Sequence, residues 1–285
     1  MTISDDQRNG GTRKVLIICH SGSGSTKTIS ELFRKKLSEL YAVDMVQVGP
    51  NPNYQILSDY DFLLFGFPTY HGRPSTSMME YVDNMPRLRA PQMTFVFTTC
   101  GLYTGNSMRI LITRLWEKNV IAAGHLQVRG PASDGVLLYP PQISLMVKYE
   151  KKAGEKVTRA VSDISRLLNL QTTEPSKPTP KWYVPLNGVV NFFGERAYHR
   201  YRDGLHILGD ECTNCNLCVK NYERGCWLAG QDRPSFKPMN CEFCLECVHN
   251  CPQQAIVFSE KMRDKPRLNR RFYRGLKAGL LESLR

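Results

Sequence analysis

Eight of the ten cysteines lie between residues 212 and 251, where their spacing is that of metal ligands. Two triplets of the form C-x2-C-x2-C occur, in the segments CTNCNLC and CEFCLEC. Triplets at this spacing wrap one corner of a [4Fe–4S] cubane, whereas C-x2-C pairs also suit tetrahedral zinc. The pattern therefore favours iron–sulfur clusters over structural zinc. The candidate ligands are Cys212, Cys215, Cys218, Cys226, Cys241, Cys244, Cys247 and Cys251.

The second triplet continues as CEFCLECVHNCP, residues 241 to 252, which resembles the ligand run of bacterial two-cluster ferredoxins. In such a run the fourth cysteine binds the other cluster of the pair. The resemblance implies that Cys251 completes the cluster of the first triplet and Cys226 that of the second. The long gap from Cys218 to Cys226 departs from the family's spacing, as does Trp227 where proline is usual. We interpret the gap as a short loop insertion.

A second candidate site is the segment SGSGST, which follows the apolar run KVLIIC and precedes a helix-like stretch. Glycines let the backbone curl around an anion, the hydroxyls add donors, and a helix N-terminus adds positive potential. The spacing is neither that of a Walker loop nor G-x-G-x-x-G. We predict a site for a monophosphate ester, the alternative being an ordinary glycine-rich turn. The site comprises Ser21, Gly22, Ser23, Gly24, Ser25 and Thr26.

The segment SGSGST resembles the phosphate loop of flavodoxins, hydroxyl-x-hydroxyl-Gly-x-Thr, placed after the first strand. Flavodoxins bind FMN and hold its ring between two further loops, for which the segments GFPTYHGRPS and TTCGLYTGNSMR are available here. Aromatic side chains stack on a flavin ring, and backbone groups bond its edge. The resemblance implies an FMN site that also includes Pro68, Thr69, Tyr70, His71, Cys100, Gly101, Tyr103, Gly105 and Asn106.

Buried strands alternate with helix-like stretches over the first two thirds of the chain. Continuous apolar strands separated by helices indicate a parallel sheet covered on both faces, with ligands at the carboxyl ends of its strands. We expect an α/β fold with a flavodoxin-like, doubly wound, five-stranded parallel sheet, plus a small α+β ferredoxin-like two-cluster domain. The predicted strands are residues 14–19, 43–49, 60–67, 92–100 and 120–130.

The chain is expected to divide into four parts. Residues 12–172 form the FMN-binding domain and 173–209 a proline-rich linker or connector. Residues 210–260 form the two-cluster domain, and 261–285 a basic C-terminal tail that is helical at its end.

The charge and hydropathy of the chain limit where it can be located and which partners it can bind. The formal net charge is +12, and no apolar run reaches the roughly 18 residues of a membrane span. The N-terminal stretch lacks a signal-peptide pattern, so we expect a cytoplasmic protein. The basic tail is expected to attract an acidic-surfaced reductase or electron donor, and peripheral membrane contact is compatible with it. No helix-turn-helix or zinc-finger pattern supports nucleic-acid binding.

FMN together with two [4Fe–4S] clusters implies an intracellular electron-transfer protein that relays low-potential electrons to a partner reductase. The alternative is an iron–sulfur flavoenzyme that reduces a small molecule or quinone at the FMN. His71 and Cys100 would then be the candidates for proton or thiol chemistry, against the plainer interpretation of a loop contact and a core residue. The sequence leaves open whether the protein is an enzyme.

Overall fold

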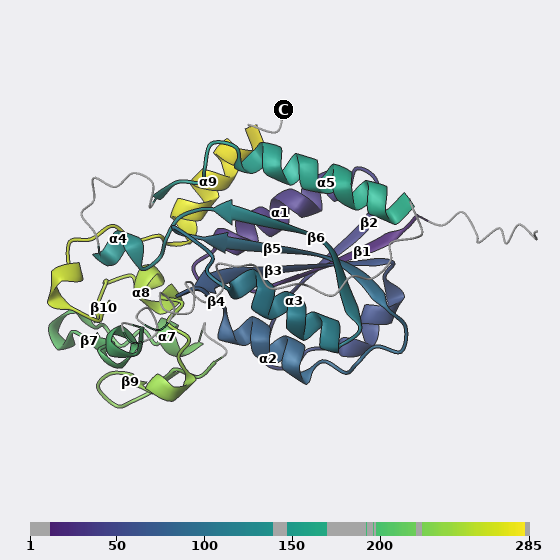
Figure 1. The fold of residues 1–285 in the computed structure, drawn as a ribbon. Coiled ribbons are helices and arrows are strands. Elements are labelled where there is room, and N and C mark those ends of the chain that lie inside the picture. The colour runs from purple at the N-terminus through teal and green to yellow at the C-terminus, as the bar shows by residue number, and fades with distance from the viewer. Residues whose placement is uncertain are drawn as a thin grey trace, which may run out of the picture.

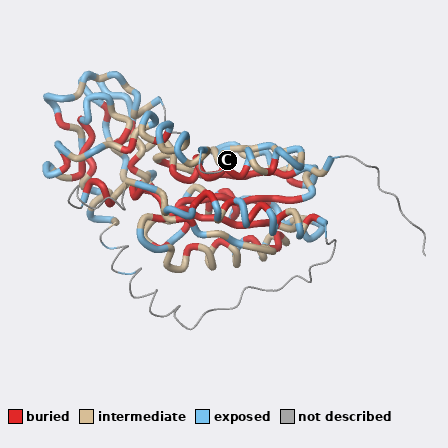
Figure 2. Tube along the Cα trace, turned by 90° about the horizontal axis from the view of Figure 1, so that it is seen from above, coloured by how far each residue is buried: buried red, intermediate tan, exposed pale blue. Residues whose placement is uncertain are grey.

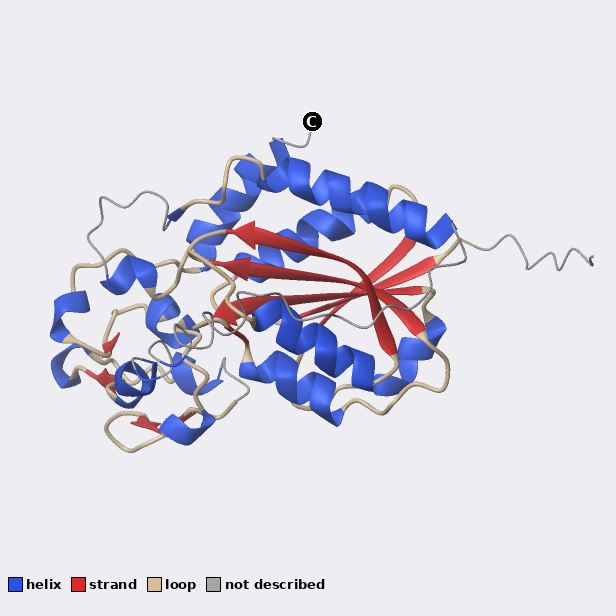
Figure 3. Cartoon of the chain, in the orientation of Figure 1, coloured by secondary structure: helices blue, strands red, loops and turns tan. Residues whose placement is uncertain are grey.

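The structure is a computed structural model that describes residues 12–138, 147–169, 192, 196, 198–220 and 224–282. Its elements are drawn in Figures 1 and 3. The strands are β1 (Lys14–Cys19), β2 (Ala42–Gln47), β3 (Phe62–Tyr70), β4 (Arg73–Pro74), β5 (Gln92–Cys100), β6 (Val120–Arg129), β7 (His206–Ile207), β8 (Trp227–Leu228), β9 (Ser235–Phe236) and β10 (Ile256–Val257). The helices are α1 (Ser25–Leu37), α2 (Thr76–Asn84), α3 (Ser107–Glu117), α4 (Gly135–Leu138), α5 (Ala153–Asn169), α7 (Leu217–Lys220), α8 (Glu246–Asn250) and α9 (Arg270–Glu282).

The main sheet has the strand order β2-β1-β3-β5-β6, and all four of these pairings are parallel. The predicted flavodoxin-like, doubly wound parallel sheet is therefore confirmed. The short strand β4 adds to it by pairing antiparallel with the end of β3. Parallel neighbours require crossover connections, which the helices supply on both faces.

Both faces of the sheet are covered by helices, and each strand sends alternate side chains to the two faces. In β1, Val15 and Ile17 belong to the core beneath α1 and α5, whereas Leu16 and Ile18 belong to the core over α2 and α3. All four are fully buried. Figure 2 shows the buried layer running through the middle of the molecule. Burial on two sides explains why these strands are apolar runs without alternation.

Strand β3 extends further than the sequence predicted and ends in a hairpin. Residues Thr69 and Tyr70 pair with Pro74 and Arg73 of β4. The turn passes through His71 and Gly72, which have φ angles of 49° and 76°. Two consecutive positive φ angles give a turn whose twist matches that of paired strands. The hairpin therefore holds the predicted aromatic loop in a defined shape.

A second lobe, formed mainly by residues 198–262, lies beyond the carboxyl ends of the main strands (Figure 1). Two small antiparallel sheets, β7 with β10 and β8 with β9, frame it. Its core includes Trp227 and Val248, and the ring of Trp227 packs 4.8 Å from that of Phe236. Most of the predicted linker, residues 173–191, 193–195 and 197, lies outside the described residues. The ferredoxin-like nature of this lobe stays a prediction.

The C-terminal segment contains the helix α9, which packs against the main domain beside α1 and α5 (Figure 1). Leu280 and Leu281 contact the core beneath α1, and Lys277 forms an ion pair with Glu31 of that helix at 2.5 Å. The segment predicted as a basic tail is thus attached to the fold along most of its helix.

Among the described residues, no helix is both long enough and apolar enough to cross a membrane.

Candidate functional site

A cavity opens at the carboxyl edge of the main sheet, where the loops after four strands meet. The predicted residues that line it are Ser21, Gly22, Ser23, Ser25, Thr26, Pro68, Thr69, Tyr70, His71, Cys100 and Gly101. The remaining wall is formed by Thr99, Pro131, Ala132, Ser133, Asp134 and Phe243. The structure therefore brings the predicted phosphate loop and both predicted flavin loops to one site.

The first wall of this cavity is the phosphate loop and the N-terminus of α1. Gly24, at φ 122°, makes the turn into the helix, a conformation that side chains rarely adopt. The hydroxyl of Ser25 is buried without a hydrogen-bond partner of good geometry among the described residues, and the nearby Tyr149 hydroxyl donates to the Ser25 carbonyl at 2.8 Å. Thr26 is different, because its hydroxyl already bonds that of Thr99 at 2.7 Å. An unpartnered buried hydroxyl beside a helix N-terminus fits an anionic ligand.

The second wall is the β3–β4 hairpin, which places Tyr70 and His71 in the cavity. Burial raises the pKa of Tyr70 well above its usual value. Burial also lowers the pKa of His71, although the carboxylate of Asp134 opposes that shift. Both rings are therefore uncharged near neutral pH.

Four predicted residues do not line this cavity. Gly24 caps α1, as described above. Tyr103 is 44% exposed in the loop after β5, and Gly105 has a φ of 53° there. The backbone N–H of Asn106 donates to the carbonyl of Gly72 at 3.1 Å, which ties this loop to the hairpin.

The sequence interpretation missed Thr99 and two further parts of the wall. Residues 131–134 follow β6, so the reasoning from strand ends that located the other loops would also have indicated this one. Phe243 comes from the second lobe, between Cys241 and Cys244. Nothing in its local sequence indicates that it reaches the other domain.

The first group of cysteines comprises Cys212, Cys215, Cys218 and Cys251, which line a second cavity in the small lobe together with Cys247. Burial, followed by the charges of the other three cysteines of the group, raises the pKa of Cys218 to about 11. Such mutual repulsion between thiolates is relieved when they ligate a metal.

The second group comprises Cys226, Cys241, Cys244 and Cys247. A hydrogen bond with Cys226 raises the pKa of Cys241, and burial raises it further. Burial also raises the pKa of Cys244, with the charges of Glu242, Glu246, Cys247 and Cys241 adding to that shift. The backbone N–H of Phe243 donates to Cys241 Sγ at 3.3 Å.

No three His, Cys, Asp or Glu side chains of the described residues are arranged to hold a single metal ion. A cubane uses one thiolate for each of four iron atoms, so its ligands stand farther apart than those of one ion. The grouping of the cysteines is compatible with that arrangement, and cluster binding stays a prediction.

The two lobes meet at the phosphate loop. A Cβ placed on Gly22 would lie 2.5 Å from the Cβ and 3.3 Å from the Sγ of Cys244, and 2.7 Å from the hydroxyl of Tyr70. Only a glycine allows this approach. One cysteine of the second group therefore packs directly against the loop that lines the main cavity.

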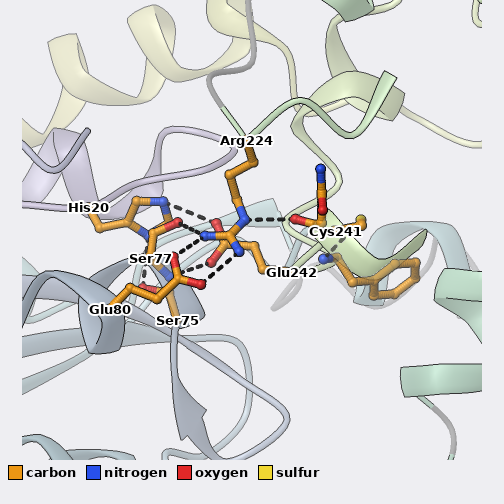
Figure 4. Close-up of polar contacts among 9 residues, drawn as sticks. His20, Ser75, Ser77, Glu80, Arg224, Cys241 and Glu242 are labelled. Atoms are coloured by element: carbon orange, nitrogen blue, oxygen red, sulfur yellow. Dashed lines mark hydrogen bonds and ion pairs between the residues drawn. The ribbon is translucent and has the colours of Figure 1, made fainter. Parts of the chain in front are cut away.

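A polar network centred on the buried Glu242 joins the lobes beside that contact (Figure 4). Glu242 lies 3.1 Å from His20 Nε2, and it accepts a hydrogen bond from the backbone N–H of Ser77 at 3.0 Å. Burial opposes ionisation of Glu242, but His20, the Ser77 N–H and Arg224 outweigh it and lower its pKa to about 2. Arg224 in turn forms a two-point ion pair with Glu80, at 2.6 and 3.0 Å.

His249 of α8 forms a further link between the lobes. Burial lowers the pKa of His249 to about 3, so the ring is neutral. Its Nδ1 accepts a hydrogen bond from the Leu268 N–H at 3.1 Å, and its Nε2 donates to the carbonyl of Ser133 at 2.9 Å. Ser133 lines the main cavity, so the second lobe braces that wall.

Residues 16–119 match the family model of the flavodoxin domain, a match that covers less than half of the chain. Flavodoxin 1 of Bacillus cereus is 21% identical, aligning with 54% of this chain and 97% of its own at a TM-score of 0.43. Flavodoxin 2 of the same organism is 18% identical, and the alignment covers 54% of this chain and 99% of that flavodoxin at a TM-score of 0.42. The flavodoxin, WrbA-like protein from Agrobacterium tumefaciens is 15% identical, and the alignment covers 56% of this chain and 100% of that protein at a TM-score of 0.42. The family match and the observed strand order identify the first domain as flavodoxin-like.

Proposed function

We propose that this is a cytoplasmic electron-transfer protein whose redox groups are FMN and two [4Fe–4S] clusters. It relays low-potential electrons between these groups and a partner reductase. The observation that supports this proposal is the contact between the lobes: Cys244 packs on Gly22, and Phe243 lines the same cavity. A flavin bound in this cavity and a cluster bound by Cys244 would therefore lie on the two sides of this contact between the lobes.

The main cavity fits FMN. Ser21, Ser23 and Ser25 would hold the phosphate together with the N-terminus of α1, and the unpartnered Ser25 hydroxyl is the feature that a phosphate would satisfy. The ring would lie between the β3–β4 hairpin and the loop that begins at Cys100.

The cysteine groups fit clusters because buried donors accompany them. Trp227 Nε1 lies beside Cys247 and has no hydrogen-bond partner of good geometry among the described residues. The terminal nitrogens of Arg267 are buried without hydrogen-bond partners in the part of the chain that the structure describes, and its charge interacts with Cys251. Anionic clusters accept such N–H groups, and these hydrogen bonds tune their reduction potentials.

When bound, FMN exchanges one or two electrons and each cluster exchanges one. The residues of the chain would set the positions of these redox groups and the environment around them. Phe243 and Tyr70 line the cavity where the lobes meet, and Glu242 holds a negative charge next to the second cysteine group. A fixed negative charge favours the oxidised form of a nearby redox group.

Electron transfer is preferred over substrate reduction because neither candidate catalytic group is activated. Burial raises the pKa of Cys100 to about 11, so its thiol stays protonated near neutral pH. His71 is neutral and packs at 5.2 Å from the ring of Tyr198. These are the properties of residues that pack against other side chains.

A cofactor assay on anaerobically purified protein tests this function. We expect about one FMN and about eight irons with matching acid-labile sulfide per chain, and two EPR signals after reduction. Zinc in place of iron would overturn the cluster assignment while leaving the flavin in place. Absence of bound FMN, together with failure of the flavin-free protein to take it up, would overturn the assignment of the main cavity.

A further inference from the structure

The helix α9 contacts the phosphate loop through one side chain, Tyr273. This residue is only 5% exposed, and its hydroxyl lies 3.2 Å from Ser23 Oγ. Its ring covers the next residue of the loop, since a Cβ on Gly24 would lie 2.8 Å from a ring carbon. A residue 250 positions away in sequence therefore contacts two successive residues of the loop.

Tyr273 is held in place from several directions, so this contact does not depend on a free tail. The backbone N–H of Arg270 donates to Asn250 Oδ1 of the second lobe at 3.1 Å. The Phe272 N–H donates to Asn269 Oδ1 at 3.0 Å, which caps the start of the helix. Farther along, Lys277 pairs with Glu31 of α1. These contacts fix α9 relative to both lobes.

We infer that Tyr273 is a positioning residue for the phosphate loop, donating its hydroxyl proton to Ser23 Oγ so that Ser23 directs its own proton to the phosphate of the ligand. This inference rests on the proposed function, because it concerns the same site. It adds a residue that lies outside the flavodoxin-like part of the chain and does not itself line the cavity.

The argument follows from the donors that are available. A phosphate dianion only accepts hydrogen bonds, so Ser23 must donate its single proton to bind it. Its oxygen is then free to accept, and a phenol is a stronger acid and hence a better donor than an aliphatic hydroxyl. Successive O–H groups that point the same way polarise one another, so Tyr273 strengthens the bond that Ser23 makes. Riboflavin lacks the phosphate, so the hydrogen bond from Tyr273 should not strengthen its binding.

The test compares FMN with riboflavin in the full-length, iron-loaded chain after reversible removal of the flavin. Tyr273→Phe keeps the ring over Gly24 and removes only the hydroxyl. We expect the Kd for FMN to rise about two- to tenfold, the range of one hydrogen bond, with the Kd for riboflavin unchanged. In a Ser23→Ala background, Tyr273→Phe should have no further effect on either ligand.

Tyr54→Phe is the matched control, since it also removes a hydroxyl that is hydrogen-bonded, here to the carbonyl of Tyr81 at 2.8 Å, away from the cavity. It should change neither Kd. Equal weakening of FMN and riboflavin by Tyr273→Phe would reduce Tyr273 to a packing residue and overturn the inference, as would an effect that persists without the Ser23 hydroxyl. If the wild-type protein itself bound the two flavins equally well, the phosphate site of the proposed function would fail instead.

Discussion

At the scale of the residue, the buried hydroxyl of Ser25 gives the sharpest prediction. It has no hydrogen-bond partner among the described residues, a state that costs about 1–3 kcal/mol when no ligand is bound. Ser25→Ala should therefore leave the melting temperature of the flavin-free protein unchanged or higher. The same change should weaken the binding of FMN by at least roughly tenfold, because a charge-assisted hydrogen bond of about 1.5–3 kcal/mol is lost.

Ser30→Ala is the control for this prediction. Its hydroxyl is also fully buried but already donates to the carbonyl of Thr26 at 2.9 Å. Its loss should lower stability and leave the ratio of FMN to riboflavin affinity unchanged. A Ser25→Ala protein that melts at a lower temperature and binds FMN normally would contradict a role for this hydroxyl in phosphate binding.

The crossed assignment of the cluster ligands is a second prediction at this scale. Cys226 interacts with Cys241, whereas Cys251 interacts with Cys218 of the other group. Cys226→Ala should therefore alter the same EPR signal as Cys241→Ala, and Cys251→Ala the signal altered by Cys212→Ala. Anaerobic iron counts and EPR redox titration of the four variants check the pairing. A Cys226→Ala protein that keeps both clusters intact would show that this cysteine is not a required ligand.

At the scale of the element, α9 changes how the basic segment should be tested for partner docking. Deleting it would expose the core and remove Tyr273, so we choose charge reversal at its exposed residues Arg271 and Arg274. The double change to glutamate should slow association with an acidic redox protein and flatten the salt dependence of the rate. Arg87→Glu with Arg89→Glu alters the charge equally in the loop before β5 and should have a smaller effect in stopped-flow measurements. Equal effects of the two pairs would mean that net charge, and not α9, attracts the partner.

The elements differ in how far the sequence could predict them. Runs such as KVLIIC are apolar on both faces, so they indicated a parallel sheet directly, and the helix Ala153–Asn169 follows from the spacing of Val157, Val161, Ile164 and Leu168. The hairpin strand β4 has only two residues, and its pairing depends on the turn conformation of His71 and Gly72. A strand this short carries no periodic signal.

The same limit applies to the candidate site. The loops from strand ends could be predicted because parallel strands bring their carboxyl ends to one edge. Phe243 and Tyr273 could not, since each reaches the site only through the docking of the second lobe and α9 onto the main domain. Contacts between segments that lie far apart in the sequence cannot be predicted from the local spacing of residues.

At the scale of the whole molecule, the two lobes share the walls of one cavity, so the proposed function implies that the binding of FMN and the binding of the clusters are coupled. Phe243 lines the cavity, and His249 holds Ser133 of its wall through the 2.9 Å hydrogen bond. Any change that loosens the second lobe should therefore weaken the binding of FMN. By linkage, bound FMN should raise the affinity of the iron sites by the same factor. Couplings of this kind are typically about 5- to 150-fold.

The prediction that follows is reciprocal. Bound FMN should slow the loss of iron to a chelator, and removal of iron should raise the Kd for FMN. Glu242→Gln should weaken both effects together, because it removes the buried charge that pairs with His20 across the lobes. Chelation kinetics with and without FMN, and FMN titrations of iron-loaded and iron-free protein, measure the two arms. Glu117→Gln is the control, since its partner Arg114 lies on the same helix. Iron loss at the same rate with and without FMN would mean that the lobes hold their cofactors independently, despite the cavity that both of them line.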